Sequence, residues 1–83
     1  MFKVINSELF AVKESGYRLD FDNDHAHIDK SLTAFDSPNR ADRDIDSFYD
    51  LDSAVLCEDE NGEMYAVRYY DDKPYIWQKV VKA

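Results

Sequence analysis

The pair Asn61-Gly62, with a strand-like run on each side, constrains the fold more than any other short stretch of the sequence. Asn-Gly is the strongest short-range signal for a tight β-hairpin, because both residues tolerate a positive φ angle. A second turn is predicted over residues 71–74, where two aspartates and a proline break the apolar pattern. Residues 53–83 are therefore expected to form a three-stranded antiparallel meander.

A two-residue loop at Asn61-Gly62 would place Val55 opposite Arg68, and a four-residue second turn would then pair Arg68 with Trp77. This register predicts two sheet faces with different residues. The face toward the core would carry Ala54, Leu56, Tyr65, Val67, Tyr69, Ile76 and Val80, and the other face Val55, Cys57, Ala66, Arg68, Tyr70, Tyr75, Trp77 and Lys79. The set Arg68, Tyr70, Tyr75 and Trp77 has two interpretations, either core under a helix or an interface, because these residue types dominate binding hot spots.

The segment 36–52 is predicted to be the principal helix, with Ser37 as its cap, Pro38 at its first position and an apolar stripe that includes Ile45 and Phe48. Residues 8–24 are predicted to form an N-terminal hairpin around Gly16, although a helix over residues 6–14 fits the spacing of the apolar residues as well. Residues 24–35 fit a helix or a strand equally.

These elements predict a single acidic α+β domain over residues 1–83, in which a small antiparallel sheet (the N-terminal hairpin plus the C-terminal meander) packs with one principal helix. The only cysteine, Cys57, leaves no internal disulfide, which favours a reducing cytoplasm, or the host cytoplasm if a phage encodes the protein. The N-terminus lacks the apolar run of a secretory signal, and no run is long enough for a membrane span.

The net charge of -8 is concentrated in the middle of the chain. Residues 20–63 hold fourteen acidic and three basic residues, a net charge of -11, whereas both flanks are slightly positive. A protein that binds nucleic acid directly needs a basic surface to neutralise phosphates, so that class is excluded. The same field attracts a basic partner and speeds its encounter.

No motif points to catalysis, a metal or a cofactor. The two D-x-D-x-D runs, at Asp20 and Asp42, lack the glycine and the final acid of a calcium loop. The histidines His25 and His27 would share one side of a strand, but they have no clear third ligand. Cys57 lies in an apolar run without oxyanion-hole glycines nearby, and the two glycines of the chain make no phosphate loop. We therefore expect no enzyme.

On a helix with 100° per residue, Asp42, Asp46 and Asp50 fall on one side, away from the apolar stripe, about 6 Å apart along the axis. Each like-charge pair at this spacing destabilises a helix by about 0.2 to 0.5 kcal/mol. Arg43 is three residues before Asp46 and within reach of an ion pair with it, but the ridge as a whole stays negative. A regular row of carboxylates has the charge pattern of a nucleic-acid strand.

In size and composition the chain resembles the small acidic DNA-mimic inhibitors of phages and mobile elements, which target restriction enzymes, CRISPR complexes, repair glycosylases or nucleoid proteins. The resemblance implies an inhibitor, a monomer or homodimer, that blocks the basic nucleic-acid site of another protein and binds neither nucleic acid nor membrane. The alternatives are an immunity protein that neutralises a basic nuclease toxin, a small metal-binding or structural module, and an acidic surface that serves solubility alone. The predicted partner-binding residues are Asp42, Asp44, Asp46, Asp50, Asp52, Tyr49, Asp20, Asp22, Glu58, Asp59, Glu60 and Trp77.

Overall fold

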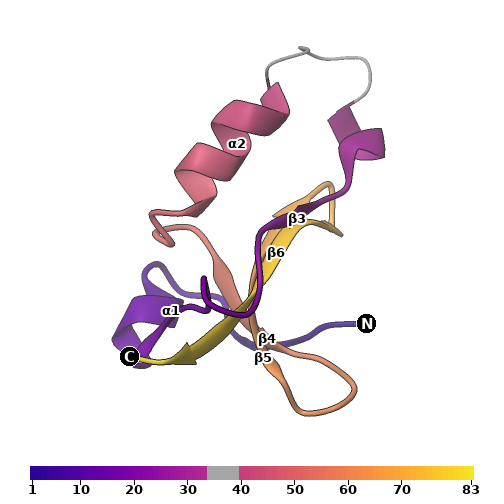
Figure 1. Ribbon diagram of the computed structural model, residues 1–83. Helices are drawn as coiled ribbons and strands as arrows, with labels where there is room; N and C mark the ends of the chain where they lie inside the picture. The colour runs from indigo at the N-terminus through magenta and orange to yellow at the C-terminus, as the bar shows by residue number, and fades with distance from the viewer. Residues whose placement is uncertain (34–39) are drawn as a thin grey trace.

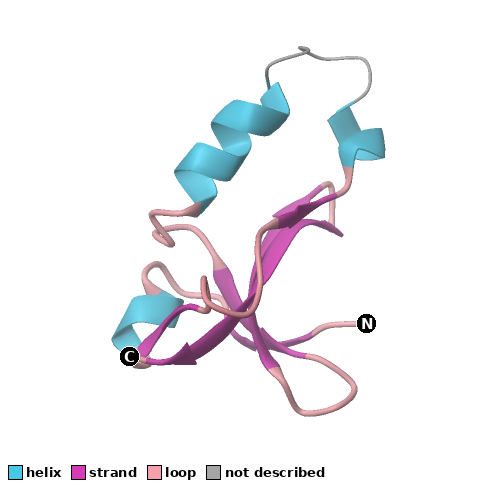
Figure 2. Ribbon diagram, viewed as in Figure 1, coloured by secondary structure: helices cyan, strands magenta, loops and turns pink. Residues whose placement is uncertain are grey.

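The C-terminal half of the chain forms the predicted meander (Figures 1 and 2). The structure, a computed structural model, describes residues 1–33 and 40–83. In it β4 (Val55–Glu58), β5 (Met64–Tyr70) and β6 (Lys73–Lys82) follow one another as antiparallel hairpins. The α+β class with a small antiparallel sheet and one main helix is thereby confirmed.

The ten-residue strand β6 pairs with more strands than any other described element. One of its edges pairs with β5, and the other pairs with two short strands, β2 (Tyr17–Leu19) at its C-terminal end and β3 (His27–Ile28) at its middle. On the far side of the sheet, β1 (Lys3–Asn6) pairs antiparallel with β4. The strand order is β1-β4-β5-β6-β2, with β3 also on β6.

The predicted N-terminal hairpin over residues 8–24 is wrong. A short helix, α1 (Ala11–Glu14), occupies its first arm, so the alternative helix over residues 6–14 was closer. The second arm contributes β2, but its partner is the distant β6. Gly16, with φ 84°, ends α1 by donating its N–H to the Lys13 carbonyl and turns the chain into β2.

The β4–β5 loop has three residues, 60–62, not two. Gly62 takes the left-handed conformation at φ 80° and donates its N–H to the Asp59 carbonyl, as in a type I turn followed by a bulge. Val55 therefore pairs with Val67 instead of Arg68, and the predicted faces of β5 are exchanged. Ala66, Arg68 and Tyr70 lie on the core face, and Tyr65, Val67 and Tyr69 on the other.

The β5–β6 loop, in contrast, is shorter than predicted. Asp71 and Asp72 both have positive φ (51° and 63°) and form a two-residue hairpin turn. A register shift follows between Arg68 and Tyr69, so that Arg68 pairs with Ile76 and Tyr75 turns toward the helix. Trp77 pairs with Val67 and lies on the opposite face, so the predicted grouping of Trp77 with Arg68 is wrong.

The principal helix is present as α2 (Arg40–Phe48), within the predicted segment 36–52. The predicted cap Ser37 and Pro38 lie outside the described residues. The segment left open, 24–35, contains the strand β3 followed by a 3-10 turn, η1 (Lys30–Thr33), and its last two residues are also outside the described part.

Both α-helices pack on the same face of the sheet. Phe48 of α2 is 1% exposed, and Val12 of α1 is fully buried. Burial of one such side chain contributes about 1.5 to 3 kcal/mol, so these contacts account for much of the docking of the helices. The core cluster consists of Ala11, Val12, Leu19, Phe48, Leu51, Ala54, Leu56, Ala66, Tyr75, Ile76 and Val80.

Polar contacts fix the inner side of α2 as well. The Arg68 guanidinium donates to the Ser47 hydroxyl and, at 3.3 Å, to the Asp44 carbonyl. The Tyr75 hydroxyl donates to the Asp44 carboxylate at 2.9 Å. The Arg40 guanidinium lies 3.4 Å from the same carboxylate and 4.9 Å from the centre of the Tyr70 ring. These contacts set which side of α2 faces solvent.

Replacing Phe48 by Ala is expected to lower the free energy of unfolding by about 3 to 5 kcal/mol, because it leaves a cavity between α2 and the sheet. Urea denaturation followed by circular dichroism measures the difference. The matched control is Phe21→Ala, which removes a ring that is 63% exposed and should cost less than about 1 kcal/mol. Equal losses in the two variants would contradict this assignment of the core.

Candidate functional site: the acidic face of α2

The outer side of α2 and the turn after it carry three exposed carboxylates, Asp42, Asp46 and Asp50, called here the acidic face. Within the described residues none of the three is in an ion pair, and the Arg43–Asp46 pair suggested by their spacing is not formed. Because α2 ends at Phe48, Asp50 lies in the turn and not on the helix itself. The regular ridge is thus two carboxylates long, with a third beyond its end.

Asp46 and Asp50 are unfavourably placed for α2, whereas Asp42 lies in its first turn, where the helix dipole favours an acid. Asp42 and Asp46 are one turn apart and repel each other. Asp46 and Asp50 also lie near the C-terminal end, where the helix dipole favours cations, and α2 has no basic residue in its last turn. The backbone carbonyl of Asp44, in the same part of α2, accepts a hydrogen bond from the side chain of Arg68 in β5.

Two further predicted partner-binding residues, Asp44 and Asp52, have partners within the protein. Asp44 points inward and binds Tyr75 and Arg40, so it holds the helix to the sheet instead of facing a partner. Asp52 forms an exposed ion pair with Lys13 at 3.1 Å, which joins α1 to the turn after α2. Exposed ion pairs of this kind contribute about 0 to 1 kcal/mol.

Asp20 and Asp22 differ in their surroundings although they are two residues apart. Asp20 is 4% exposed, and its carboxylate accepts a hydrogen bond from the Asn23 side chain at 3.2 Å. Asp22 is exposed. Only Asp22 of the pair is available to another molecule.

The acidic residues Glu58, Asp59 and Glu60 lie at the β4–β5 turn, at the opposite end of the molecule from α2 (Figure 1). Asp59 accepts the N–H groups of Asn61 and Glu63, both at 2.9 Å, and so closes the turn. Glu60 pairs with the N-terminal amino group at 2.9 Å. The sequence leaves open whether this loop lies beside the acidic ridge or across the molecule from it, and in the structure the sheet separates the two regions.

The two aromatic residues among the predicted partner-binding residues, Tyr49 and Trp77, lie in different places. Tyr49 follows α2, is 41% exposed and lies edge-on to the Phe21 ring, with the ring centres 5.7 Å apart. Trp77 is half-buried on the other sheet face, where it stacks on His27 at 6.0 Å and contacts Phe2 at 6.1 Å. Only Tyr49 adjoins the acidic face.

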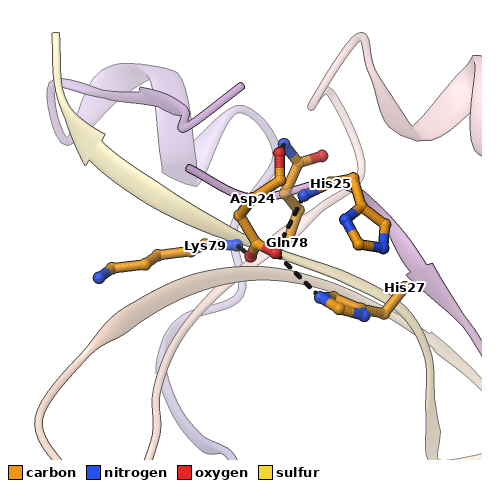
Figure 3. A network of polar contacts seen from close by, with 5 residues as sticks. All are labelled: Asp24, His25, His27, Gln78 and Lys79. Atoms are coloured by element: carbon orange, nitrogen blue, oxygen red, sulfur yellow. Dashed lines mark hydrogen bonds and ion pairs between the residues drawn. The ribbon is translucent and has the colours of Figure 1, made fainter. Parts of the chain in front are cut away.

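A second polar cluster surrounds Asp24 at the edge of β6 (Figure 3). Its carboxylate accepts the backbone N–H groups of Lys79 and His25, both at 2.9 Å, and lies 3.0 Å from His27 Nε2. Burial raises the pKa of Asp24, but the hydrogen bonds from Lys79, His25 and His27 outweigh it, so the pKa lies below its usual value. The clue in the sequence was the run Asp24 to His27, which sequence reasoning considered as a metal site only.

Other reactive groups lie in environments that suppress their chemistry. Burial raises the pKa of the Cys57 thiol, although a hydrogen bond with the Tyr69 hydroxyl at 3.8 Å opposes the shift. Burial, together with that contact, raises the pKa of Tyr69 to about 12. Both groups are neutral at pH 7, so neither is an activated nucleophile. Within residues 1–33 and 40–83, no three His, Cys, Asp or Glu side chains are arranged to hold a metal ion.

Comparison of the chain with protein-family models, with curated proteins and with solved structures finds no match in any of the three. The helices described for this chain are all too short or too polar to cross a membrane.

Replacing Asp46 by Lys is expected to raise the free energy of unfolding by about 0.5 to 1 kcal/mol, because it removes the repulsion from Asp42 and places a cation near the C-terminal end of α2. Urea denaturation at low ionic strength measures the gain, which should shrink at about 1 M salt. Asp22→Lys makes the same charge change outside a helix and serves as the control. A gain of equal size in the control would show that only net charge matters.

Replacing Asp24 by Ala is expected to destabilise the protein by about 1.5 to 3 kcal/mol at pH 7, because charge-assisted hydrogen bonds are lost. The folded-state pKa is lowered, so the contribution is present above the unfolded value of about 3.9 and disappears as the pH falls through the folded pKa. Urea denaturation of the unmodified protein and of the Asp24→Ala variant, from pH 7 down through the folded pKa, measures this contribution. A difference that does not change with pH would contradict the ionic role.

Proposed function

We propose that this protein is a nucleic-acid mimic, which uses the acidic face to bind a basic, nucleic-acid-binding protein and blocks its nucleic-acid site. It acts by binding and not by catalysis. The observation that carries the proposal is the presence of three exposed carboxylates, Asp42, Asp46 and Asp50, with no ion pair among the described residues, on a helix and turn that are firmly held from the other side.

The helix is a suitable scaffold for such a mimic because its orientation is fixed. Arg68 and Tyr75 hold its inner side, so the outer carboxylates are presented without a large rearrangement. Asp42 and Asp46 lie about 6 Å apart along the axis, and carboxylates accept the same charge-assisted hydrogen bonds from Arg and Lys as phosphates do. A groove lined with cations for a nucleic-acid strand offers complementary donors.

The unfavourable placement of Asp46 and Asp50 supports a role in recognition. Helix stability and solubility would both be served by a mixture of Lys and Glu on the outer side of α2. The chain instead places aspartates there, including positions next to the negative end of the helix dipole. Long-range attraction from the region with a net charge of -11 would also speed encounter with a basic protein.

Affinity capture from a bacterial lysate tests the proposal. We expect the unmodified chain to retain a basic nucleic-acid-binding protein at about 50 mM salt and to lose most of it at about 300 mM, because screening weakens exposed charge contacts. Added duplex DNA or RNA should release the captured protein by competing for the same site. The variant Asp42→Asn, Asp46→Asn, Asp50→Asn should not retain it.

The matched control neutralises three acids at the far end of the molecule, Glu58→Gln, Glu60→Gln and Glu63→Gln. It changes the net charge by the same amount and should retain the partner. Loss of the partner in both variants would show that binding depends on the net charge of the protein and not on the acidic face. Retention in both, or a complex that nucleic acid does not displace, would contradict the mimic.

A further inference from the structure

Apolar side chains are exposed around the turn that follows α2. Leu9 is 67% exposed, Phe10 43%, Phe21 63% and Tyr49 41%. They come from three segments: the turn before α1, the loop after β2 and the turn after α2. Contiguous exposed apolar groups with a polar rim are typical of interaction sites.

Contacts between side chains and between backbone groups bring these segments together. The Phe21 and Tyr49 rings meet edge to face with their centres 5.7 Å apart. The Phe10 N–H donates to the Asp52 carbonyl at 3.1 Å, and Lys13 pairs with the Asp52 side chain. The turn over residues 49–52 is therefore the common neighbour of the other two segments.

The backbone is strained at Phe10, whose side chain gains little burial in return. Phe10 has φ 64°, a left-handed conformation that is rare for a bulky residue and costs about 1 to 2 kcal/mol. Leu51 has a similar φ of 62°, but its side chain is 5% exposed, so burial offsets the cost. The Phe10 side chain remains 43% exposed.

Each residue of the exposed aromatic pair is followed in the chain by an aspartate. Asp22 follows Phe21 and Asp50 follows Tyr49, and both aspartates are exposed. Neither has an ion pair among the residues that the structure describes. This surface thus combines two exposed aromatic rings with negative charges that have no ion pair, and it lies beside Asp50 of the acidic face.

We propose that Phe21 and Tyr49, with the carboxylates of Asp22 and Asp50, form a binding site for an arginine side chain of the basic partner. The inference rests on the proposed function and adds to it the chemical class of the contact. Arginine fits because its planar guanidinium stacks on aromatic rings and also donates paired hydrogen bonds to carboxylates. Lysine offers a strongly hydrated point charge and fits the rings less well. A second copy of this chain would bring like charge to the site.

Titration of the full chain with two peptides of equal length and charge, oligo-arginine and oligo-lysine, tests the site. Two-dimensional NMR spectra of the labelled protein report the affinity and the residues that respond. We expect the arginine peptide to bind about three- to fivefold tighter, with shifts at Phe21, Tyr49 and Asp50. The variant Phe21→Ser, Tyr49→Ser should bind both peptides equally, while Tyr49→Phe should keep the preference because it keeps the ring.

The control Val4→Ser, Ile5→Ser removes two other exposed apolar side chains, each 49% exposed, from β1 and should keep the preference for arginine. Circular dichroism checks that each variant folds. Equal binding of the two peptides to the unmodified chain, or a preference that survives in Phe21→Ser, Tyr49→Ser, would overturn the arginine site. Neither result would decide the proposed function, which depends on capture and release with the Asp42, Asp46 and Asp50 variant.

Discussion

The docking of α2 on the sheet through Arg68, Tyr75 and Phe48 determines what the protein presents to solvent. Phe48 supplies apolar burial, and the two polar side chains bind the backbone and side chains of the helix at defined positions. Because a helix rotates by 100° per residue, fixing Asp44 inward forces Asp42 and Asp46 outward. The acidic face is therefore a consequence of the packing on the opposite side of the same helix.

Aspartates in this chain serve two different purposes, and the structure separates them. Asp24, Asp44 and Asp59 accept hydrogen bonds from groups of the protein itself and hold β6, α2 and the β4–β5 turn in place. Asp42 and Asp46 have no such structural role among the described residues. A small domain with a limited core gains from the first group, because each charge-assisted hydrogen bond contributes about 1.5 to 3 kcal/mol. In the second group, Asp46 lies near the C-terminal end of α2 and repels Asp42, so it lowers helix stability, whereas Asp42 lies in the first turn, where the helix dipole favours an acid.

Sequence reasoning predicted the elements that follow from local pattern, but it missed the length of the turns and the pairing between distant segments. The meander and α2 follow from Asn61-Gly62 and from helical spacing. The register was missed because Gly62 alone, not the pair, takes the left-handed conformation, which lengthens the loop by one residue. The pairing of β2 with β6 joins residues about sixty positions apart and leaves no local signal.

For the candidate site, helical geometry sufficed to place Asp42 and Asp46 outward. The same geometry places Asp44 on the side of Phe48, four residues later, so its inclusion among the predicted partner-binding residues was an oversight. Asp20 lies outside the helix, and its role depends on which donors the fold brings near it.

The carboxylate of Asp24 has a further consequence for the long strand β6. Between the stretches paired with β2 and β3, the Lys79 N–H would point outward without a partner strand, and the Asp24 side chain occupies that position (Figure 3). A free strand edge is a template on which another chain can add its own strand and begin to aggregate. Two short strands and one side chain thus cover the edge of β6 together. The chain can expose aromatic rings elsewhere with less risk that neighbouring molecules join through their sheets.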